Sequence, residues 1–480
     1  MGSKLDQNLF FKRLLCLTKI YFLTILSKVN LMEQRKYKVA IIGSGPAGIF
    51  AAIELGKKGI KDIVVIEKGN DIDSRDKRET MCGFGGGGTF SDGKLHFDLC
   101  LSQEKLLDFI SENEAQELVN RVEKDFLDFG VDAPITPKGI EEAEVFIEKC
   151  QRHNISLYPR KIRHVGSDVL PIVIRRMRQK LTELGVEIIT NCEITEIKQQ
   201  NGVFELHSSE KIFTSSILLI APGRIGTKWL QRVSEKIGLK YEYQKIEIGV
   251  RVEFPASITR KQTEVMYEAI YALHTPTFDD LMRTLCPCPN GYVAVENYDD
   301  YVCVNGHSNS QNESPNSNFA LLQEVVLTDP VENTTDYAIA VARLTTTLGG
   351  GKPLVQRLAD LRKGRRSTES RIAKSLVIPT LKDCAPGDIA MALPYRTVKN
   401  ILEALDLLNN VLPGINSGSN LLYAPEIKLR GSRIKTNKNL ETNIPGLFVA
   451  GDGAGVSGNI VGAAATGILA ANGIIKKSCF

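Results

Sequence analysis

The 480-residue sequence lacks several signals that would assign it to a functional class at once. None of its ten cysteines forms a C-x-x-C pair, and no cysteine and histidine set has zinc-site spacing, so we expect no metal site. Basic and acidic residues nearly balance, 60 against 56, which argues against a nucleic-acid partner. Scattered thiols in so long a chain are typical of the reducing cytosol, and we expect a cytoplasmic protein.

Long uncharged apolar runs are also missing. Residues 9–26 are apolar, but Lys12, Arg13 and Lys19 interrupt them, whereas a membrane span needs about 20 nearly uncharged residues. No small-residue cleavage site of a signal peptide follows. Residues 1–35 form an N-terminal extension with three interpretations: a translated segment upstream of a start at Met32, which we favour, an amphipathic surface helix, or an organelle transit peptide.

A strand–turn–helix–strand unit follows this extension. Residues 38–43 are a short, continuously apolar and β-branched run, which predicts a strand buried on both faces. Residues 49–58 have helical spacing, and a second buried strand at 63–66 ends at Glu67. The turn between strand and helix reads Gly43-Ser44-Gly45-Pro46-Ala47-Gly48. This context turns a weak G-x-G-x-x-G match into a prediction of a dinucleotide site.

Each residue type in this unit has a physical role. Gly43 makes the tight turn, Gly45 lets the backbone approach a pyrophosphate, and Gly48 lets helix and strand pack closely. The pyrophosphate would lie at the helix N-terminus, where free N–H groups and the helix dipole favour anions. Glu67 stands at the spacing of an acid that hydrogen-bonds a ribose hydroxyl. The unit does not distinguish FAD from NAD.

The remaining periodicity predicts two kinds of domain. Residues 106–129 and 169–184 have helical spacing, and strands are expected at 186–189, 193–197, 203–206 and 217–220. Residues 240–395 change character, and the chain ends with a strand at 447–450 and a small-residue helix at 460–476. We predict an α/β fold: a Rossmann-like domain, with a parallel sheet and helices on its faces, assembled from discontinuous segments, plus a mixed α+β substrate domain. The expected segments are 1–35 (extension), 36–98 (nucleotide-binding domain, first part), 99–160 (helical insertion), 161–238 (second part), 239–400 (substrate domain) and 401–480 (C-terminal part of the first domain).

Residues 442–452 resemble the second FAD fingerprint of flavoprotein oxidoreductases. In that family the acid, here Asp452, binds the ribityl chain of the flavin. The following helix directs its N-terminus, here near Gly458, Asn459, Ile460 and Val461, at the flavin pyrimidine edge, where its dipole would stabilise reduced flavin. Residues 220–224 resemble the Ala-Thr-Gly strand end of these flavoproteins, with Pro in place of Thr and Gly223 at the turn.

The segment 82–95, which contains Ser-Asp-Gly-Lys-Leu after four glycines, narrows the match. It resembles a largely uncharacterised family of FAD-dependent dehydrogenases, and so do residues 164–168, 249–253, 286–289, 304–308, 316–318, 350–353 and 451–455. The resemblance covers about 36–477. The sequence departs from it by having no Ala among residues 85–88 and no basic residue at Gly458. The loop offers backbone N–H groups without side-chain bulk, as a phosphate or flavin contact requires, although a lid without cofactor contact is the alternative.

The resemblance and the motifs together assign the cofactor site. The expected FAD contacts are Gly43, Ser44, Gly45, Pro46, Ala47, Gly48, Glu67, Lys68, Gly85, Gly86, Gly87, Gly88, Ser91, Ile194, Gly223, Gly451, Asp452, Asn459, Ile460 and Val461. His96, after the glycine loop, and His307, in the presumed substrate domain, are candidates for acid–base catalysis, with packing or surface roles as the alternative. Cys82 and the pair Cys286 and Cys288 could be redox-active, although they lack the spacing of a dithiol redox motif.

The predicted function is an FAD-dependent oxidoreductase that transfers hydride between flavin N5 and a small organic molecule. There is no second G-x-G-x-x-G unit, so NADH or NADPH, if it is the donor, would dock directly at the flavin. Electrons from another substrate or a partner protein are the other routes. Three alternatives stay open: a flavin-dependent RNA-modifying enzyme, a non-catalytic FAD-binding redox protein, and a thiazole-forming or isomerase-like relative with Cys82 as its reactive thiol.

Overall fold

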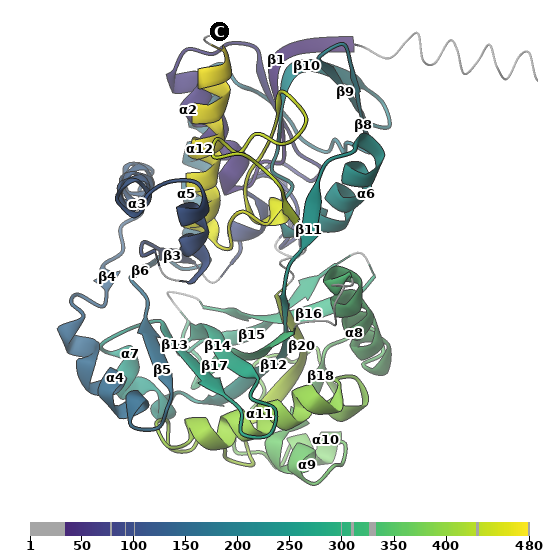
Figure 1. The fold of residues 1–480 in the computed structure, drawn as a ribbon. Helices are drawn as coiled ribbons and strands as arrows, with labels where there is room; N and C mark the ends of the chain where they lie inside the picture. Colours follow the sequence, from purple (N-terminus) through teal and green to yellow (C-terminus); the bar gives the residue numbers. More distant parts are fainter. Residues whose placement is uncertain are drawn as a thin grey trace, which may run out of the picture.

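The computed structural model describes residues 34–76, 79–91, 93–99, 101–298, 300–308, 312–325, 333–428 and 432–478. The three interpretations of the N-terminal extension therefore fall on residues outside the described part. Two bodies, each with its own sheet, lie one above the other in Figure 1, and the chain passes between them several times. An α/β fold with a Rossmann-like first domain and a mixed second domain is confirmed.

The first domain is built on a seven-stranded sheet. Its order is β7 (Glu187–Ile189), β2 (Ile63–Ile66), β1 (Gln34–Ile42), β10 (Ile212–Ile220), β9 (Val203–His207) and β8 (Glu196–Gln200), with β22 (Leu447–Val449) also paired to β10. Helices α2 (Pro46–Lys57), α5 (Leu170–Glu183) and α12 (Ile460–Ser478) lie on one side of it, and α6 (Thr227–Ile237) lies on the other (Figure 1).

The register of the parallel strands fixes where a ligand binds. Ile42 at the end of β1 is paired with Ile66 of β2 and with Ile220 of β10, and Ile220 is paired with Val449 of β22. The carboxyl ends of these strands therefore meet at one edge of the sheet. In open parallel sheets, ligands bind in the crevice at this edge.

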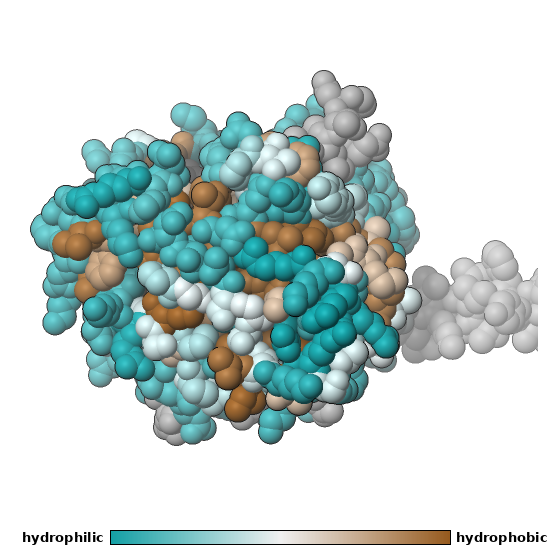
Figure 2. Space-filling view, turned by 90° about the horizontal axis from the view of Figure 1, so that it is seen from below, coloured by the Kyte–Doolittle hydropathy of each residue, from teal (hydrophilic) through white to brown (hydrophobic). Residues whose placement is uncertain are grey.

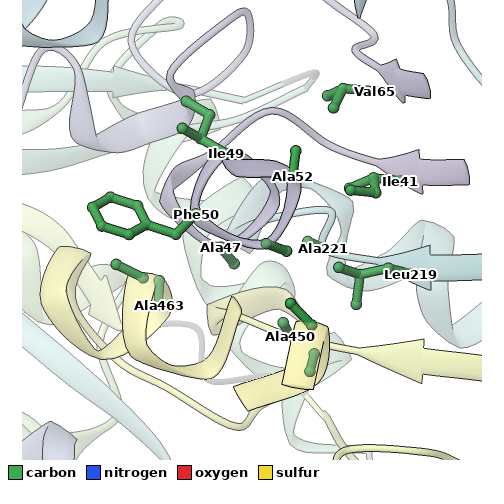
Figure 3. Close-up of a cluster of buried hydrophobic side chains, with 14 of the residues drawn as sticks. Ile41, Ala47, Ile49, Phe50, Ala52, Val65, Leu219, Ala221, Ala450 and Ala463 are labelled. Carbon is green, nitrogen blue, oxygen red and sulfur yellow. The ribbon is translucent and has the colours of Figure 1, made fainter. Parts of the chain in front are cut away.

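Small side chains let the helices approach the sheet closely. Figure 3 shows Ile41, Val65 and Leu219, one from each of three neighbouring strands, beside α2 and the C-terminal segment. Helix α12 packs on α2 so tightly that a Cβ atom at Gly467 would lie 2.2 Å from the Ala47 carbonyl oxygen. Among the described residues, α12 is the one helix long and apolar enough to cross a bilayer, and 67% of its window Ile460–Lys477 is buried inside the protein.

Two segments of the first domain differ in detail from the sequence-based expectation. The strand expected at 193–197 is β8, Glu196–Gln200, and it lies at the opposite edge of the sheet from β7, because β7 joins β2 in parallel while β8 and β9 form an antiparallel meander with β10. The helix expected at 106–129 is a 3-10 turn, Leu101–Asp108, followed by α3 (Glu112–Asp128). A capping box between Ser111 and Glu114 begins α3, because the two side chains satisfy the free N–H groups of its first turn.

The second domain is a largely antiparallel eight-stranded sheet with one parallel pair at its edge. Its order is β19 (Ala385–Pro386), β18 (Leu354–Arg357), β20 (Leu421–Lys428), β12 (Ile246–Pro255), β17 (Asn316–Val325), β14 (Leu281–Cys288), β13 (Ala269–His274) and β5 (Ser156–Pro159). The hairpin of β15 (Tyr292–Asn297) and β16 (Val302–His307) and the helices α8 (Thr334–Leu348) and α11 (Tyr395–Leu408) pack on it. The short helices are α4 (Glu144–Gln151), α7 (Arg260–Thr263), α9 (Leu358–Arg362) and α10 (Glu369–Ile372).

The predicted domain boundaries need two corrections. Residues 401–428 belong to the second domain, because α11 packs on its core and β20 lies between β18 and β12. The return to the first domain comes at β21 (Ser432–Ile434), which pairs with β11 (Tyr241–Tyr243). The insertion at 99–160 is not all helical, since β4 (Ile135–Thr136) pairs with β6 (Ile162–His164), and β5 joins the second sheet. Strand β3 (Lys94–His96) completes the small sheet with β6.

The face of the second domain that points away from the first is mostly hydrophilic (Figure 2). Hydrophobic groups are scattered over it among polar ones. Scattered apolar side chains of this kind are normal on a protein surface and indicate no binding site.

Candidate active site

A cavity of about 720 Å³ lies where the carboxyl edge of the first sheet faces the second domain. The first domain contributes the glycine turn, the glycine-rich loop and the C-terminal fingerprint to its wall. The second domain contributes the ends of β14 and β20, the β15–β16 hairpin and α8. Cofactor and substrate pockets commonly enclose about 300–1,000 Å³, so this cavity has the size of a ligand site.

The turn between β1 and α2 leaves no room for side chains. A Cβ atom at Gly43, where φ is +97°, would lie 2.1 Å from the Ala221 carbonyl oxygen, and one at Gly48 would lie 2.0 Å from the Gly43 carbonyl oxygen. Gly45 faces more open space and is the N-cap of α2, without a side-chain cap. The free N–H groups in the first turn of α2 therefore lie at the cavity wall, where an anion can accept hydrogen bonds from them.

Glu67 ties the turn to the glycine-rich loop. Its buried carboxylate accepts hydrogen bonds from Ser44 N and Oγ at 3.0 and 2.7 Å, from Gly69 N at 2.9 Å and from Gly83 N at 3.1 Å. These four donors fix the orientation of the carboxylate. Glu67 thus has a scaffold role that the sequence did not predict, and its bond to a ribose hydroxyl stays a prediction.

Cys82 lies beside this carboxylate, with Sγ 3.9 Å from Glu67 Oε1. Burial and the neighbouring Glu67 charge raise the pKa of the Cys82 thiol to about 11. A thiol in this environment stays protonated at neutral pH and is a poor nucleophile. The geometry therefore does not favour the alternative in which Cys82 is the reactive group.

The glycine-rich loop passes between the two fingerprints. Gly85 N donates to Ser44 O at 2.9 Å, and a Cβ atom at Gly86, where φ is +65°, would lie 2.9 Å from Gly45 Cα. On the other side, a Cβ atom at Gly88 would lie 3.1 Å from Ile460 Cγ1 at the start of α12. The loop therefore joins the turn before α2 to the turn before α12.

The buried side chain of Arg75 supports the loop from behind, and sequence reasoning missed it. Its guanidinium donates to Phe84 O at 2.9 Å and to Thr89 Oγ1 at 3.0 Å. Desolvation by burial lowers the pKa of Arg75 to about 10, so the group is still charged at neutral pH. No local pattern in the sequence signals this role.

The C-terminal fingerprint closes the cavity from the β22 side. A Cβ atom at Gly453 would lie 2.2 Å from the Gly223 carbonyl oxygen, so the turns after β10 and β22 touch. Asp452 is partly exposed in the cavity wall and accepts a hydrogen bond from Ser457 Oγ. Asn459 caps α12 by accepting from Gly462 N at 2.8 Å.

Most of the predicted cofactor residues line this one cavity. They are Gly43, Gly45, Pro46, Ala47, Glu67, Lys68, Gly86, Gly87, Gly88, Ser91, Ile194, Gly223, Gly451, Asp452, Asn459 and Ile460. Four do not line it: Ser44, which bonds Glu67, Gly48 and Gly85, which are packed against backbone or side chains, and Val461, which is buried in the core. Asp92 of the loop lies outside the described residues.

The structure separates the two candidate histidines. His96 lines the cavity, and its Nε2 lies 2.9 Å from Glu268 Oε2. His307 is not among the lining residues, since its Nδ1 shares a hydrogen bond with Ser167 Oγ at 3.2 Å. The structure thus does not place His307 at this cavity, and its contact with Ser167 fits the alternative of a packing role, since it joins the β15–β16 hairpin to the first domain.

A buried charge cluster surrounds His96. Lys94 Nζ lies 3.3 Å from Glu268 Oε2 and donates to Pro287 O at 2.8 Å, and both ionic side chains are almost fully buried. Burial opposes ionisation of Glu268, but His96 and Lys94 outweigh it and hold the pKa of this carboxyl below its usual range. Arg160 in the same wall bonds Asp98 at 3.0 Å. Sequence reasoning missed Glu268 because it stands far along the chain, directly before β13, in a segment without a motif.

A second charge cluster lies at and behind the cavity wall, where Lys428 and Arg224 line the cavity. Arg251 and Glu426 form a fully buried ion pair at 3.2 Å, and Lys428 Nζ donates to Glu426 Oε1 at 2.9 Å. Arg224 follows Gly223 at the end of β10, with Nε 4.0 Å from Asp452 Oδ2. No group of three or more metal-ligating side chains is present in the described part of the chain.

The geometry fits FAD. The two helix N-termini, of α2 and α12, and the glycine-rich loop meet at one cavity, and the positions where a Cβ atom would clash are those that bring these backbones together. Residues 36–78 match a family model described as FAD binding domain, and residues 245–429 match one described as FAD-dependent protein, C-terminal domain-like.

Individual proteins that are similar to this chain add little to these two family matches. An uncharacterized protein from Clostridium beijerinckii is 27% identical over 490 residues, which cover 93% of this chain and 82% of the relative. Among solved structures, glycine oxidase from Geobacillus kaustophilus is 13% identical over 92% of this chain and 95% of its own, with a TM-score of 0.41. L-proline dehydrogenase from P. horikoshii is 14% identical over 93% and 95%, with a TM-score of 0.43. Scores this low say nothing about the substrate of this chain.

The two matched families account for both domains, one for the start of the cofactor domain and the other for the second domain. Both fingerprints meet at a cavity of suitable size. The two matched models and the cavity together indicate an FAD-dependent oxidoreductase.

Proposed function

We propose that the protein transfers hydride between bound FAD and a small organic molecule that reaches the cavity from the second domain. The main support for this proposal is that a single cavity is lined by residues of both domains. Gly45 and Asp452 line it from the first domain, and Arg283 and Asn305 line it from the second. FAD, when bound, supplies the redox chemistry, and the protein needs only to bind, orient and exchange a proton.

The cofactor-binding residues act mainly through backbone. The free N–H groups at the start of α2 would receive the pyrophosphate, as the uncapped N-cap Gly45 favours. Asp452 would bind the ribityl chain, and Ser457, which donates to Asp452, would orient it. The N-terminus of α12 would face the pyrimidine edge of the flavin.

His96 is the proposed group that holds or moves a proton on the substrate side. Its ring lines the cavity, and its hydrogen bond to the ionised Glu268 fixes the ring orientation. Glu268 is therefore a positioning residue. Because the His96 side chain is 12% exposed, water has limited access to it even before a ligand fills the cavity.

An absorbance spectrum of the purified protein, followed by anaerobic addition of NADH and then NADPH, tests the proposal. The bands of oxidised flavin are expected, and bleaching by one nicotinamide identifies the donor. Flavin that neither nicotinamide bleaches indicates direct substrate oxidation or a protein donor. A colourless protein that cannot be reconstituted with FAD contradicts the proposal.

A His96→Gln variant tests the proton-transfer role. Turnover with the donor found above should fall by about 100-fold or more, and the pH profile should lose one limb, while flavin content stays at the wild-type level. His153→Gln is the matched control, because His153 is exposed and does not line the cavity. Equal turnover in the two variants contradicts a role for His96.

A further inference from the structure

Strand β14 ends in a bulge that directs a cysteine toward the cavity. Leu285 is paired with Ala320 and Cys288 with Asn318, so Cys286 and Pro287 together stand opposite one residue of β17. Cys286 has φ of +45°, a conformation uncommon for residues other than glycine, and it lines the cavity. Bulges of this kind are frequent beside active sites, where they change the direction of a side chain.

Two buried cations hold this bulge in place. Arg251 Nη2 donates to the Cys286 carbonyl at 2.6 Å, and Lys94 Nζ donates to the Pro287 carbonyl at 2.8 Å. The Arg251 and Lys94 side chains are 0% and 1% exposed, so each fixes the bulge from inside the protein. Pro287 has no N–H, so the bulge leaves no donor unsatisfied there. A conformation supported this heavily is a feature of the fold.

Three cationic side chains act on Cys286. Its sulfur interacts electrostatically with Arg224, Arg251 and Lys428, all of them cations. Cations next to a partly exposed cysteine are the environment in which thiols become reactive.

The nearby carboxylates have their own partners. Glu426 accepts from Arg251 and Lys428, and Asp452 accepts from Ser457. Glu296 accepts from Asn305. Each of these three carboxylates is thus already engaged by a donor other than the thiol.

Cys288 is within reach as a second thiol. It is buried, with Sγ 3.5 Å from Arg251 Nη2 and 3.6 Å from the Cys286 carbonyl oxygen. Residues two apart in a strand are separated by at most about 6.8 Å between Cα atoms, and a bulge shortens this. A disulfide requires a Cα separation of about 4.4–6.8 Å, and the strand spacing sets the upper limit of this pair at the upper end of that range.

We propose that Cys286 and Cys288 form a redox-active dithiol that exchanges two electrons with the flavin, with Cys286 as the cavity-facing thiol and Cys288 as its resolving partner. Oxidation breaks two S–H bonds and forms one S–S bond, and two electrons and two protons pass to the oxidised flavin. This inference rests on the FAD site of the proposed function, and it adds a thiol–disulfide couple to it.

Thiol mapping and a reductive titration test the dithiol on the full-length protein. After oxidation in air, denaturation and alkylation, the peptide that contains both cysteines should carry a disulfide by mass spectrometry. Anaerobic titration with dithionite should consume about four electron equivalents per flavin, two for the cofactor and two for the disulfide. Cys286→Ser and Cys288→Ala should each consume about two. If the buried Cys288 variant does not fold, Cys286→Ser suffices.

Cys384→Ser is the matched control, because Cys384 is a partly buried cysteine that is in no disulfide and does not line the cavity, and the variant should behave as wild type. Alkylation of both thiols in the air-oxidised protein, with about two equivalents consumed by wild type, overturns the dithiol. Flavin content separates the two proposals: a colourless protein contradicts the cofactor site, while a flavin-loaded protein with both thiols free contradicts the dithiol alone. Alkylation of the two thiols is measured whether or not the protein contains flavin.

Discussion

Replacing Glu268 with glutamine should destabilise the protein by about 3–5 kcal/mol, because it breaks a buried ion pair from one side. The Lys94 and Glu268 side chains are 1% and 3% exposed, and Lys94 Nζ lies 3.3 Å from Glu268 Oε2. Glutamine keeps the shape and an acceptor for His96, but it removes the negative charge that compensates the Lys94 ammonium. Urea unfolding of the FAD-saturated proteins, followed by circular dichroism, measures the difference.

The same pair predicts how this difference depends on pH. Burial opposes ionisation of Glu268, but His96 and Lys94 outweigh it and lower its pKa in the folded protein. A carboxyl whose pKa falls on folding stabilises the protein above its unfolded pKa, about 4.3, and this contribution is lost as the pH falls toward the folded pKa. The gap between wild type and variant should therefore be full near neutral pH and should shrink below about pH 4.

Glu183→Gln is the control for this series. Glu183 pairs with Lys180 on the surface of α5, with side chains 50% and 39% exposed, and such pairs are worth at most about 0.5 kcal/mol. A Glu268→Gln effect no larger than that of the control, or a gap that stays constant as the pH falls, would refute the assigned ion pair.

Two further predictions concern the cofactor site. Asp452→Asn should lower FAD affinity at least tenfold while unfolding of the apoprotein changes little; the two are measured by fluorescence titration and by urea, and full flavin retention would show that the C-terminal assignment is wrong. Gly86→Ala should weaken FAD binding and cost more stability than Gly59→Ala, because both glycines are left-handed but only Gly86 has a backbone atom, Gly45 Cα, 2.9 Å from the added Cβ. Equal losses of stability in the two alanine variants would show that the loop accommodates the added methyl group and that the contact with Gly45 does not matter.

The sequence alone determined the units whose signal is local. The run at 63–66 has the same bounds as β2, and the run at 447–450 differs from β22 by one residue, because a strand buried on both faces is apolar throughout. The role of Gly43 could be predicted from the sequence, because a side chain at this turn would be strained by the positive φ and would clash with the Ala221 carbonyl oxygen.

Only the tertiary structure decided which elements pair. Periodicity states which face of a strand is buried but not which strand lies beside it, so the sequence did not show that β7 and β8, which follow each other along the chain, lie at opposite edges of the sheet. The same limit placed residues 401–428 in the wrong domain, since β20 is equally apolar in either sheet.

The polar groups of the cavity needed the structure for a different reason. A buried charge is stable only beside its partner, and the partner here comes from far along the chain, as Glu268 does for His96 and Glu426 does for Arg251. The position of Cys286 at the cavity wall likewise depends on the bulge in β14, which the sequence did not reveal. Local sequence therefore specified the cofactor, because its turns are built from backbone, whereas the chemistry around it depended on long-range contacts between charged side chains.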